Sequence, residues 1–243
     1  MSDPQREATA IEARLRALGD PERAANEARY LKSERRHLGV RVPEVRREAR
    51  ATAKSVTTRR QLTALARALW DSPVHERRCC AAYLLQARAE LLAPADLALL
   101  ERLIREAETW ALVDVLAASV VGPLLLAHPE AAERIDRWAR DRDFWVRRAA
   151  LLSQLPAARE GRSLQRFFRY ADAMLEEREF FIRKAIGWVL REASKSRPEE
   201  VYLWLLPRAG RASGVTYREA VKYLPPGQRE SLWLTRTAAT GGR

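Results

Sequence analysis

The chain has 243 residues, with 44 lysines and arginines against 32 aspartates and glutamates, and a formal net charge of +12. With 47% hydrophobic and 31% charged residues it has enough apolar side chains for a core, which excludes a disordered chain. Only five of the basic residues are lysines, and the planar guanidinium of arginine binds phosphate in a bidentate manner. The composition therefore favours a nucleic-acid partner over a merely solvated basic surface.

Cysteine and histidine residues are too few and too isolated to indicate a disulfide framework or a metal site. Cys79 and Cys80 are adjacent in an apolar stretch, and His37, His75 and His128 show no metal-ligand spacing. We therefore expect no metal and no cofactor. The first residues are polar and do not resemble a signal peptide, so we expect a cytoplasmic protein that is associated with the nucleoid through DNA binding.

Helical periodicity runs along the whole chain, with proline and glycine between the periodic segments, and no segment alternates like a strand. Residues 110–127 carry one charge, Asp114, and approach the length of a membrane span; because their neighbours are amphipathic and charged, we expect a buried central helix. The tail after about residue 224 is expected to be loosely held. Helices are predicted over residues 5–18, 22–35, 44–54, 58–69, 74–90, 95–108, 110–127, 130–140, 143–155, 163–175, 178–195, 199–206 and 216–223.

Four segments align without gaps, at a spacing typical of helical repeats. Residues 77–82, 147–152 and 183–188 each begin with two basic residues, and residues 113–118 form the fourth copy. Arg78, Asp114, Arg148 and Lys184 are then equivalent, at spacings of 36, 34 and 36 residues. We predict an all-α fold, a right-handed α-solenoid of tandem HEAT-like helix pairs with a basic concave face, as a single domain over residues 1–243.

Aromatic side chains accompany the charges of two of these repeats. Trp110 and Asp114 are four residues apart, so they lie one above the other on a helix. Lys184, Trp188 and Arg191 form a stripe that is rotated away from the apolar one. Trp188 is placed either to contact a sugar or base or simply to pack. Asp114 is either a buried carboxylate with a basic partner or a group that faces the substrate.

The chemistry that these residues suit is a reaction with a cationic transition state. The sequence has no Ser-His-Asp set and no glycine-rich phosphate loop. A carboxylate beside indole rings stabilises positive charge electrostatically. Cleavage of an N-glycosidic bond produces such a charge on the sugar, as other glycoside hydrolyses do.

The sequence resembles the AlkD-like DNA alkylation repair proteins, which are HEAT-like repeat DNA glycosylases, from about residue 21 to 223. The resemblance is densest in residues 28–32, 69–73, 110–114, 145–150 and 180–192. It implies a monofunctional glycosylase that releases cationic N3- or N7-alkylated purines from duplex DNA without base flipping. We expect a monomer without an obligate protein partner. Asp114 would stabilise the oxocarbenium and orient the water, and Trp110 and Trp188 would pack on the sugar and backbone. The resemblance and the basic residues at equivalent repeat positions together predict five DNA contacts: Tyr30, Lys32, Arg148, Lys184 and Arg191.

The sequence departs from the family pattern at the start of the catalytic helix. Many relatives read Trp-Trp-Asp-x-Val-Asp where this chain has residues 109–114, Thr-Trp-Ala-Leu-Val-Asp. The missing first tryptophan and first aspartate leave the preferred lesion open. Two alternatives therefore stand beside general repair: a glycosylase specialised for bulky adducts, such as self-resistance to a DNA-alkylating natural product, and a non-catalytic HEAT-like DNA-binding scaffold.

Overall fold

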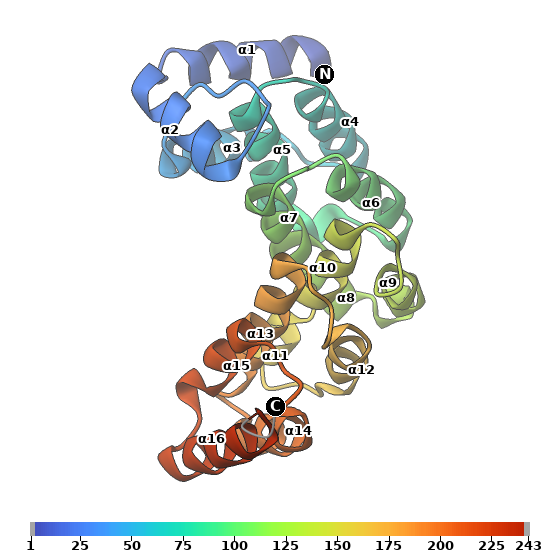
Figure 1. The fold of residues 1–243 in the computed structure, drawn as a ribbon. Helices are drawn as coiled ribbons and strands as arrows, with labels where there is room; N and C mark the ends of the chain where they lie inside the picture. Colours follow the sequence, from blue (N-terminus) through green and yellow to red (C-terminus); the bar gives the residue numbers. More distant parts are fainter. Residues whose placement is uncertain (1–2, 241–243) are drawn as a thin grey trace. The chain divides into compact units, whose positions relative to one another are not determined.

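The computed structural model describes residues 3–240, and within them the chain is helical throughout, without a strand (Figure 1). An isolated bridge between Arg36 and Val74 is the one extended pairing in this range. The helices are α1 (Pro4–Arg16), α2 (Pro21–Leu31), α3 (Val42–Ala53), α4 (Arg59–Trp70), α5 (His75–Ala87), α6 (Leu97–Arg105), α7 (Trp110–Leu116), α8 (Gly122–Ala127), α9 (Ala132–Trp138), α10 (Phe144–Leu152), α11 (Leu155–Arg159), α12 (Gln165–Met174), α13 (Phe180–Ala193), α14 (Pro198–Leu205), α15 (Gly214–Ala220) and α16 (Pro226–Thr240).

The chain divides into two compact units, one up to Leu124 and the other from Leu125. Each helix packs mainly on helices close to it in sequence, which is the behaviour of tandem helical repeats. The predicted fold class, an all-α array of helix pairs, is thus confirmed. The expectation of a single domain over the whole chain stays a prediction.

The first unit is organised around α5, which packs against α3, α4 and α7. Its core is aliphatic, with Leu62, Leu69 and Leu84 fully buried. The helix starts follow local chemistry: Asp20 caps α2 by accepting a hydrogen bond from the Arg23 amide at 3.0 Å, and Pro21 occupies the first turn. α2 is the exception in this unit, because none of its residues is buried.

The second unit is built on a succession of packed helices in which α13 contacts α10, α11 and α15. Ile182, Ile186 and Val189 on α13 are fully buried. The predicted apolar stripe of this helix is therefore confirmed. The neighbouring stripe, with Lys184 and Trp188, is half-buried and borders solvent.

The helix starts correct the repeat alignment by one residue in its first copy. The first residues of α5, α7, α10 and α13 are His75, Trp110, Phe144 and Phe180. The residue equivalent to Asp114 is consequently Cys79, and Arg78 lies one position earlier. The sequence alignment placed Arg78 in register because it matched the basic pair and could not see where each helix begins.

Arginine at the fourth helical position has a structural use in three of these repeats. The Arg78 and Arg183 Nε atoms donate to the carbonyls of Ser72 and Glu177, at 2.9 and 2.6 Å. Arg147 Nη1 donates to the Asp141 carbonyl at 2.6 Å. Each acceptor lies six residues before its arginine, so the guanidinium ties the helix start to the preceding loop. These three arginines belong to the architecture.

Two other expectations are revised. The predicted helix over 110–127 is interrupted by a π-helix at Ala117–Val121, because Pro123 has no amide hydrogen to donate to Ser119 one turn earlier. Among the described residues, Trp110–Ala127 is the stretch apolar and long enough to cross a membrane, and 50% of it is buried inside the protein. The segment after residue 224, expected to be loosely held, forms the helix α16.

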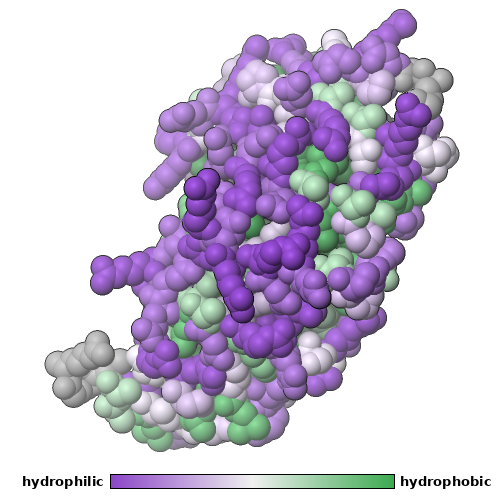
Figure 2. Space-filling model, turned by 90° about the vertical axis from the view of Figure 1, so that its right-hand side faces the viewer, coloured by the Kyte–Doolittle hydropathy of each residue, from purple (hydrophilic) through white to green (hydrophobic). Residues whose placement is uncertain are grey.

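α16 is fastened by its apolar and its polar side chains. Leu232 is fully buried, and Arg236 Nη1 donates to the carbonyls of Ala209 and Ala212 at 2.6 and 2.7 Å. Figure 2 shows one face of the molecule, on which hydrophilic residues dominate and hydrophobic ones form small islands. Such a surface is that of a chain whose apolar residues are mostly inside.

Candidate nucleic-acid interface

The first unit brings together three of the predicted site residues at the start of α7. Thr109 caps this helix by accepting from the Ala111 amide at 3.4 Å, which makes Trp110 its first residue. Asp114 follows one turn later on the same face, half-buried. The Tyr30 ring from α2 meets the Trp110 ring edge-on, with 6.0 Å between centroids, although Tyr30 is 73% exposed. A carboxylate and two aromatic rings thus border solvent in one place.

The loop before α7 is held by the residue Glu106. Its backbone carbonyl accepts from Arg35 at 2.7 Å and from Arg78 at 2.8 Å, and its carboxylate accepts from Trp70 Nε1 at 3.0 Å. Burial and the nearby Arg35 charge lower the pKa of Arg78 to about 10, so Arg78 remains a cation at neutral pH. These contacts fix the point from which α7 projects Trp110 and Asp114.

Backbone strain flanks the Tyr30–Trp110 contact. Lys32 has φ 50° and Glu108 has φ 56°, and they are the non-glycine residues with positive φ among residues 3–240. Each such residue costs roughly 1–2 kcal/mol, and strain of this kind is concentrated at functional sites. Lys32 ends α2 in this conformation and is exposed, two residues after Tyr30. Glu108 precedes Trp110 by two residues.

In the second unit, Arg148 is buried. Arg148 is only 3% exposed. Its Nη1 donates to the Phe181 carbonyl, and its guanidinium lies 5.7 Å from the centre of the Phe181 ring. A buried guanidinium with these contacts supports the packing of α10 on α13. The predicted contact of Arg148 with a DNA phosphate stays a prediction.

Lys184 and Arg191 share one acidic partner, Glu219 on α15. Lys184 Nζ lies 2.6 Å from Glu219 Oε1, and Arg191 Nη1 donates to Glu219 Oε2. Burial alone would raise the pKa of Glu219, but the hydrogen bond from Lys184 and the neighbouring positive charges lower it below its usual value. Two of the predicted DNA-binding cations are therefore held side by side by a carboxylate.

Trp188 is half-buried one turn after Lys184. The adjacent Gly187 allows α15 to come close, because a Cβ there would lie 2.7 Å from the Glu219 Cβ and 3.0 Å from the Thr216 carbonyl oxygen. The glycine thus sets the distance at which Glu219 reaches the two cations. The contact of Trp188 with DNA that the sequence predicts stays untested.

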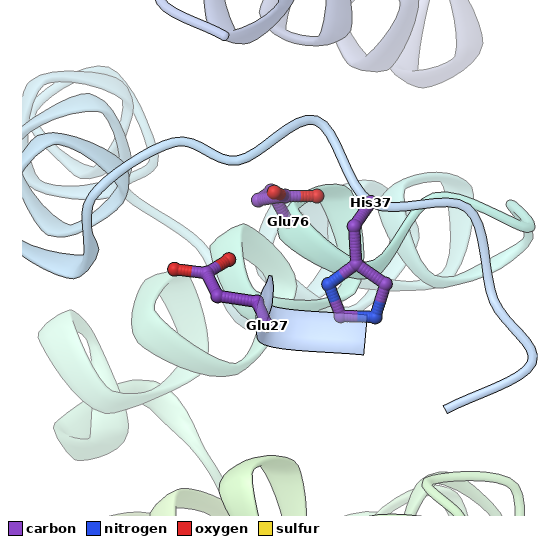
Figure 3. A group of neighbouring side chains, drawn as sticks. All are labelled: Glu27, His37 and Glu76. Atoms are coloured by element: carbon purple, nitrogen blue, oxygen red, sulfur yellow. The ribbon is translucent and has the colours of Figure 1, made fainter. Parts of the chain in front are cut away.

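Sequence reasoning missed Glu219 and a second polar cluster. Glu219 lies 35 residues from Lys184, and no local pattern signals the pair. In the first unit, Glu27, His37 and Glu76 come together from α2, the following loop and α5, with one potential ligand atom from each within 4.8 Å of the others (Figure 3). These are the residues of the described chain that could hold a metal ion, and their spacing in the sequence gives no sign of it.

Comparison with known proteins relates this arrangement to a function. The sequence profile of the DNA alkylation repair enzyme family matches residues 11–224. The chain belongs to this family. Its membership establishes a role in DNA repair and DNA as the substrate, and the residues at the start of α7 fall within the matched range. Among curated proteins, none matches this chain significantly.

Solved structures of two bacterial proteins share the fold of this family member. A predicted DNA alkylation repair enzyme from Enterococcus faecalis is 23% identical, and the match covers 86% of this chain and 98% of that one, with a TM-score of 0.75. AlkD2 from Streptococcus mutans is 21% identical over 76% of this chain and 90% of its own, with a TM-score of 0.59. At these identities the likeness concerns the fold, and the chemistry has to be argued from the residues.

Proposed function

We propose that this repair enzyme is a DNA glycosylase that hydrolyses the N-glycosidic bond of cationic N3- or N7-alkylated purines in duplex DNA. Asp114 would stabilise the oxocarbenium-like sugar and orient the attacking water. Trp110 would pack on the deoxyribose and backbone, with Tyr30 beside it, and Trp188 would provide a second aromatic contact. The protein would act as a monomer in the cytoplasm, with the base left in the helical stack.

The observation that carries this proposal is the juxtaposition of Asp114, Trp110 and the exposed Tyr30 in a member of a DNA repair family. Positive charge that develops on the sugar is stabilised by a carboxylate and by the faces of aromatic rings. A cationic purine is already a good leaving group, so the reaction has little need of a general acid. Lys32 and Glu108, with positive φ on either side of this contact, support a functional role, because strained residues are concentrated at functional sites. Lys32 also serves as the left-handed cap that ends α2.

The test is excision of 7-methylguanine from a duplex oligonucleotide by wild type and by Asp114→Asn. We expect the variant to release base about 100- to 1000-fold more slowly, a loss of about 3–4 kcal/mol of transition-state stabilisation, while its DNA affinity stays the same. Asp172→Asn is the matched control, because it also removes one carboxylate, from a partly exposed pair with Arg208. Full activity of Asp114→Asn would remove the catalytic role from this residue.

A second candidate substrate is favoured by two positions at the start of α7. Thr109 and Ala111 stand where many relatives carry a tryptophan and an acidic residue. Ala111 is half-buried and small, and Thr109 is taken up by the helix cap. Less bulk beside Trp110 suits a larger lesion, so the substrate could be a bulky alkylpurine adduct. A competition between methylated and bulky adducts in one excision assay separates the two. Absence of release from both would leave a DNA-binding scaffold.

A further inference from the structure

We propose that Glu27, His37 and Glu76 form a binding site for one divalent transition-metal ion, with zinc as the representative, that fastens α2 to the first unit. One potential ligand atom from each residue lies within 4.8 Å of the others. Imidazole nitrogen and carboxylate oxygen are both ligands of zinc, and three protein ligands leave a position for water. The proposal concerns metal binding and is independent of the glycosylase activity.

His37 supplies the observation that points to a ligand. Neither of its ring nitrogens has a hydrogen-bond partner, and both atoms are buried from solvent. A buried polar atom without a partner costs roughly 1–3 kcal/mol, and such atoms are rare in folded proteins. The ring is held flat against His75, with 4.4 Å between centroids and 18° between planes. An orientated imidazole with an unused lone pair is a ready metal ligand.

Glu76 supplies a fixed carboxylate. The residue is 2% exposed, and its Oε1 accepts from the Leu38 and Gly39 amides at 2.9 and 2.6 Å. Its Oε2 accepts from Leu38 at 2.9 Å, which leaves a further lone pair for a cation. The loop that carries His37 is bound to Glu76 through these amides, so the two ligands belong to one rigid piece.

Glu27 completes the set from α2. A tetrahedral zinc ion brings its ligand atoms to about 3.3 Å from one another, so atoms that lie within 4.8 Å have to approach by up to about 1.5 Å. Glu27 is half-buried, and a change of rotamer provides this movement. A cation between the Glu27 and Glu76 carboxylates would balance their negative charges.

The position of α2 gives the site a use. This helix buries none of its residues, yet it presents Tyr30 to Trp110, one turn after Glu27. Packing therefore provides little to hold it, and a metal bond through Glu27 would provide a tether. A hollow of about 430 Å³ lies beside the helix and borders Glu27; it is lined by Asp20, Glu22, Arg23, Asn26, Glu27 and Tyr30.

The experiment is a calorimetric titration of the tag-free, chelator-treated full chain with zinc chloride, and in parallel with magnesium chloride. We expect one zinc ion per chain and at least tenfold weaker binding of magnesium, because magnesium prefers oxygen ligands. His37→Ala and Glu27→Gln should each weaken zinc binding at least tenfold. Cobalt(II) in place of zinc should give a visible spectrum that His37→Ala alters.

His128→Ala is the matched control, because it also removes a histidine beside a carboxylate, but away from the proposed site. The His128 ring nitrogen lies 3.1 Å from the Glu130 carboxylate at the surface. This variant should leave the affinity and the stoichiometry unchanged. Circular dichroism shows whether each variant is folded. Glu27 is not among the fully buried residues, so Glu27→Gln keeps the test open if His37→Ala does not fold. Absence of saturable zinc binding by wild type would overturn the proposal. Equal binding by Glu27→Gln and wild type, or loss of binding in His128→Ala, would do the same.

Discussion

Glu219→Gln should strengthen DNA binding and make it more sensitive to salt. In the wild type, one carboxylate holds Lys184 and Arg191, so the three side chains together carry one positive charge. The lysine side chain is 40% exposed and the arginine side chain 23%. Both cations are therefore within reach of solvent, and neutralising Glu219 would release them for phosphate while keeping an amide oxygen as acceptor.

The magnitude follows from counterion release. Each additional phosphate contact changes the slope of log affinity against log salt concentration by about −0.9. With one to two cations released, the variant should show a slope steeper by about 0.9 to 1.8. For one contact, a fourfold rise in salt would then cost the variant about 3.5-fold more affinity than it costs the wild type.

Fluorescence anisotropy with an undamaged duplex at several salt concentrations measures this slope. Glu176→Gln is the matched control, because it removes one carboxylate from the same unit but from an exposed pair with Arg211. An equal change in both variants would show that net charge alone is responsible. An unchanged slope in Glu219→Gln would refute the reasoning that Lys184 and Arg191 face the DNA.

Three further predictions concern stability, which urea unfolding measures; the second also concerns the salt slope of DNA binding, which fluorescence anisotropy measures. Because the pKa of Glu219 is lowered, its ion pairs stabilise the fold above its ordinary pKa of 4.5 and are lost as the pH falls through the lowered value; the stability difference between wild type and Glu219→Gln should fade over that range, and a constant difference would contradict the pairing. Lys32→Gly should stabilise the protein by about 1 kcal/mol, because glycine adopts the positive φ without strain. It should also reduce the slope of log DNA affinity against log salt concentration by about 0.9, whereas Glu108→Gly should relieve strain and leave that slope unchanged. Gly187→Ala should destabilise by about 1–3 kcal/mol because the added methyl meets Glu219 and Thr216, and Gly227→Ala, with no atom within 4 Å of its added Cβ, should not.

Periodicity predicted the helical class and most helices because the apolar spacing is set by the core. Prediction from periodicity failed where a single proline determines the backbone conformation. The tail after about residue 224 was expected to be loosely held, yet Pro226 suits the first turn of a helix, and α16 begins there. Pro123 was placed inside one helix, although its missing amide hydrogen widens the chain into a π-helix.

For the site, the sequence predicted the local set and missed the partners from distant segments. Trp110 and Asp114 were found together because helical spacing alone makes them neighbours. Glu219 could not be paired with Lys184, since only the packing of α13 on α15 brings them to 2.6 Å. His37 looked isolated for the same reason: its neighbours Glu27 and Glu76 reach it through the fold.

Arg78, Arg147 and Arg183 donate hydrogen bonds to loop carbonyls, and this limits what the net charge says about DNA binding by this chain. These guanidinium groups serve as internal fasteners, so the formal charge of +12 exceeds what a phosphate backbone meets. Exchanging the three for lysine would leave that charge and the isoelectric point nearly unaltered. A lysine ammonium has no planar fork with which to reach a carbonyl and a neighbour at once, so helix starts would loosen while bulk electrostatics stayed the same. Part of the arginine content of the sequence thus serves loop geometry and not contact with polyanions.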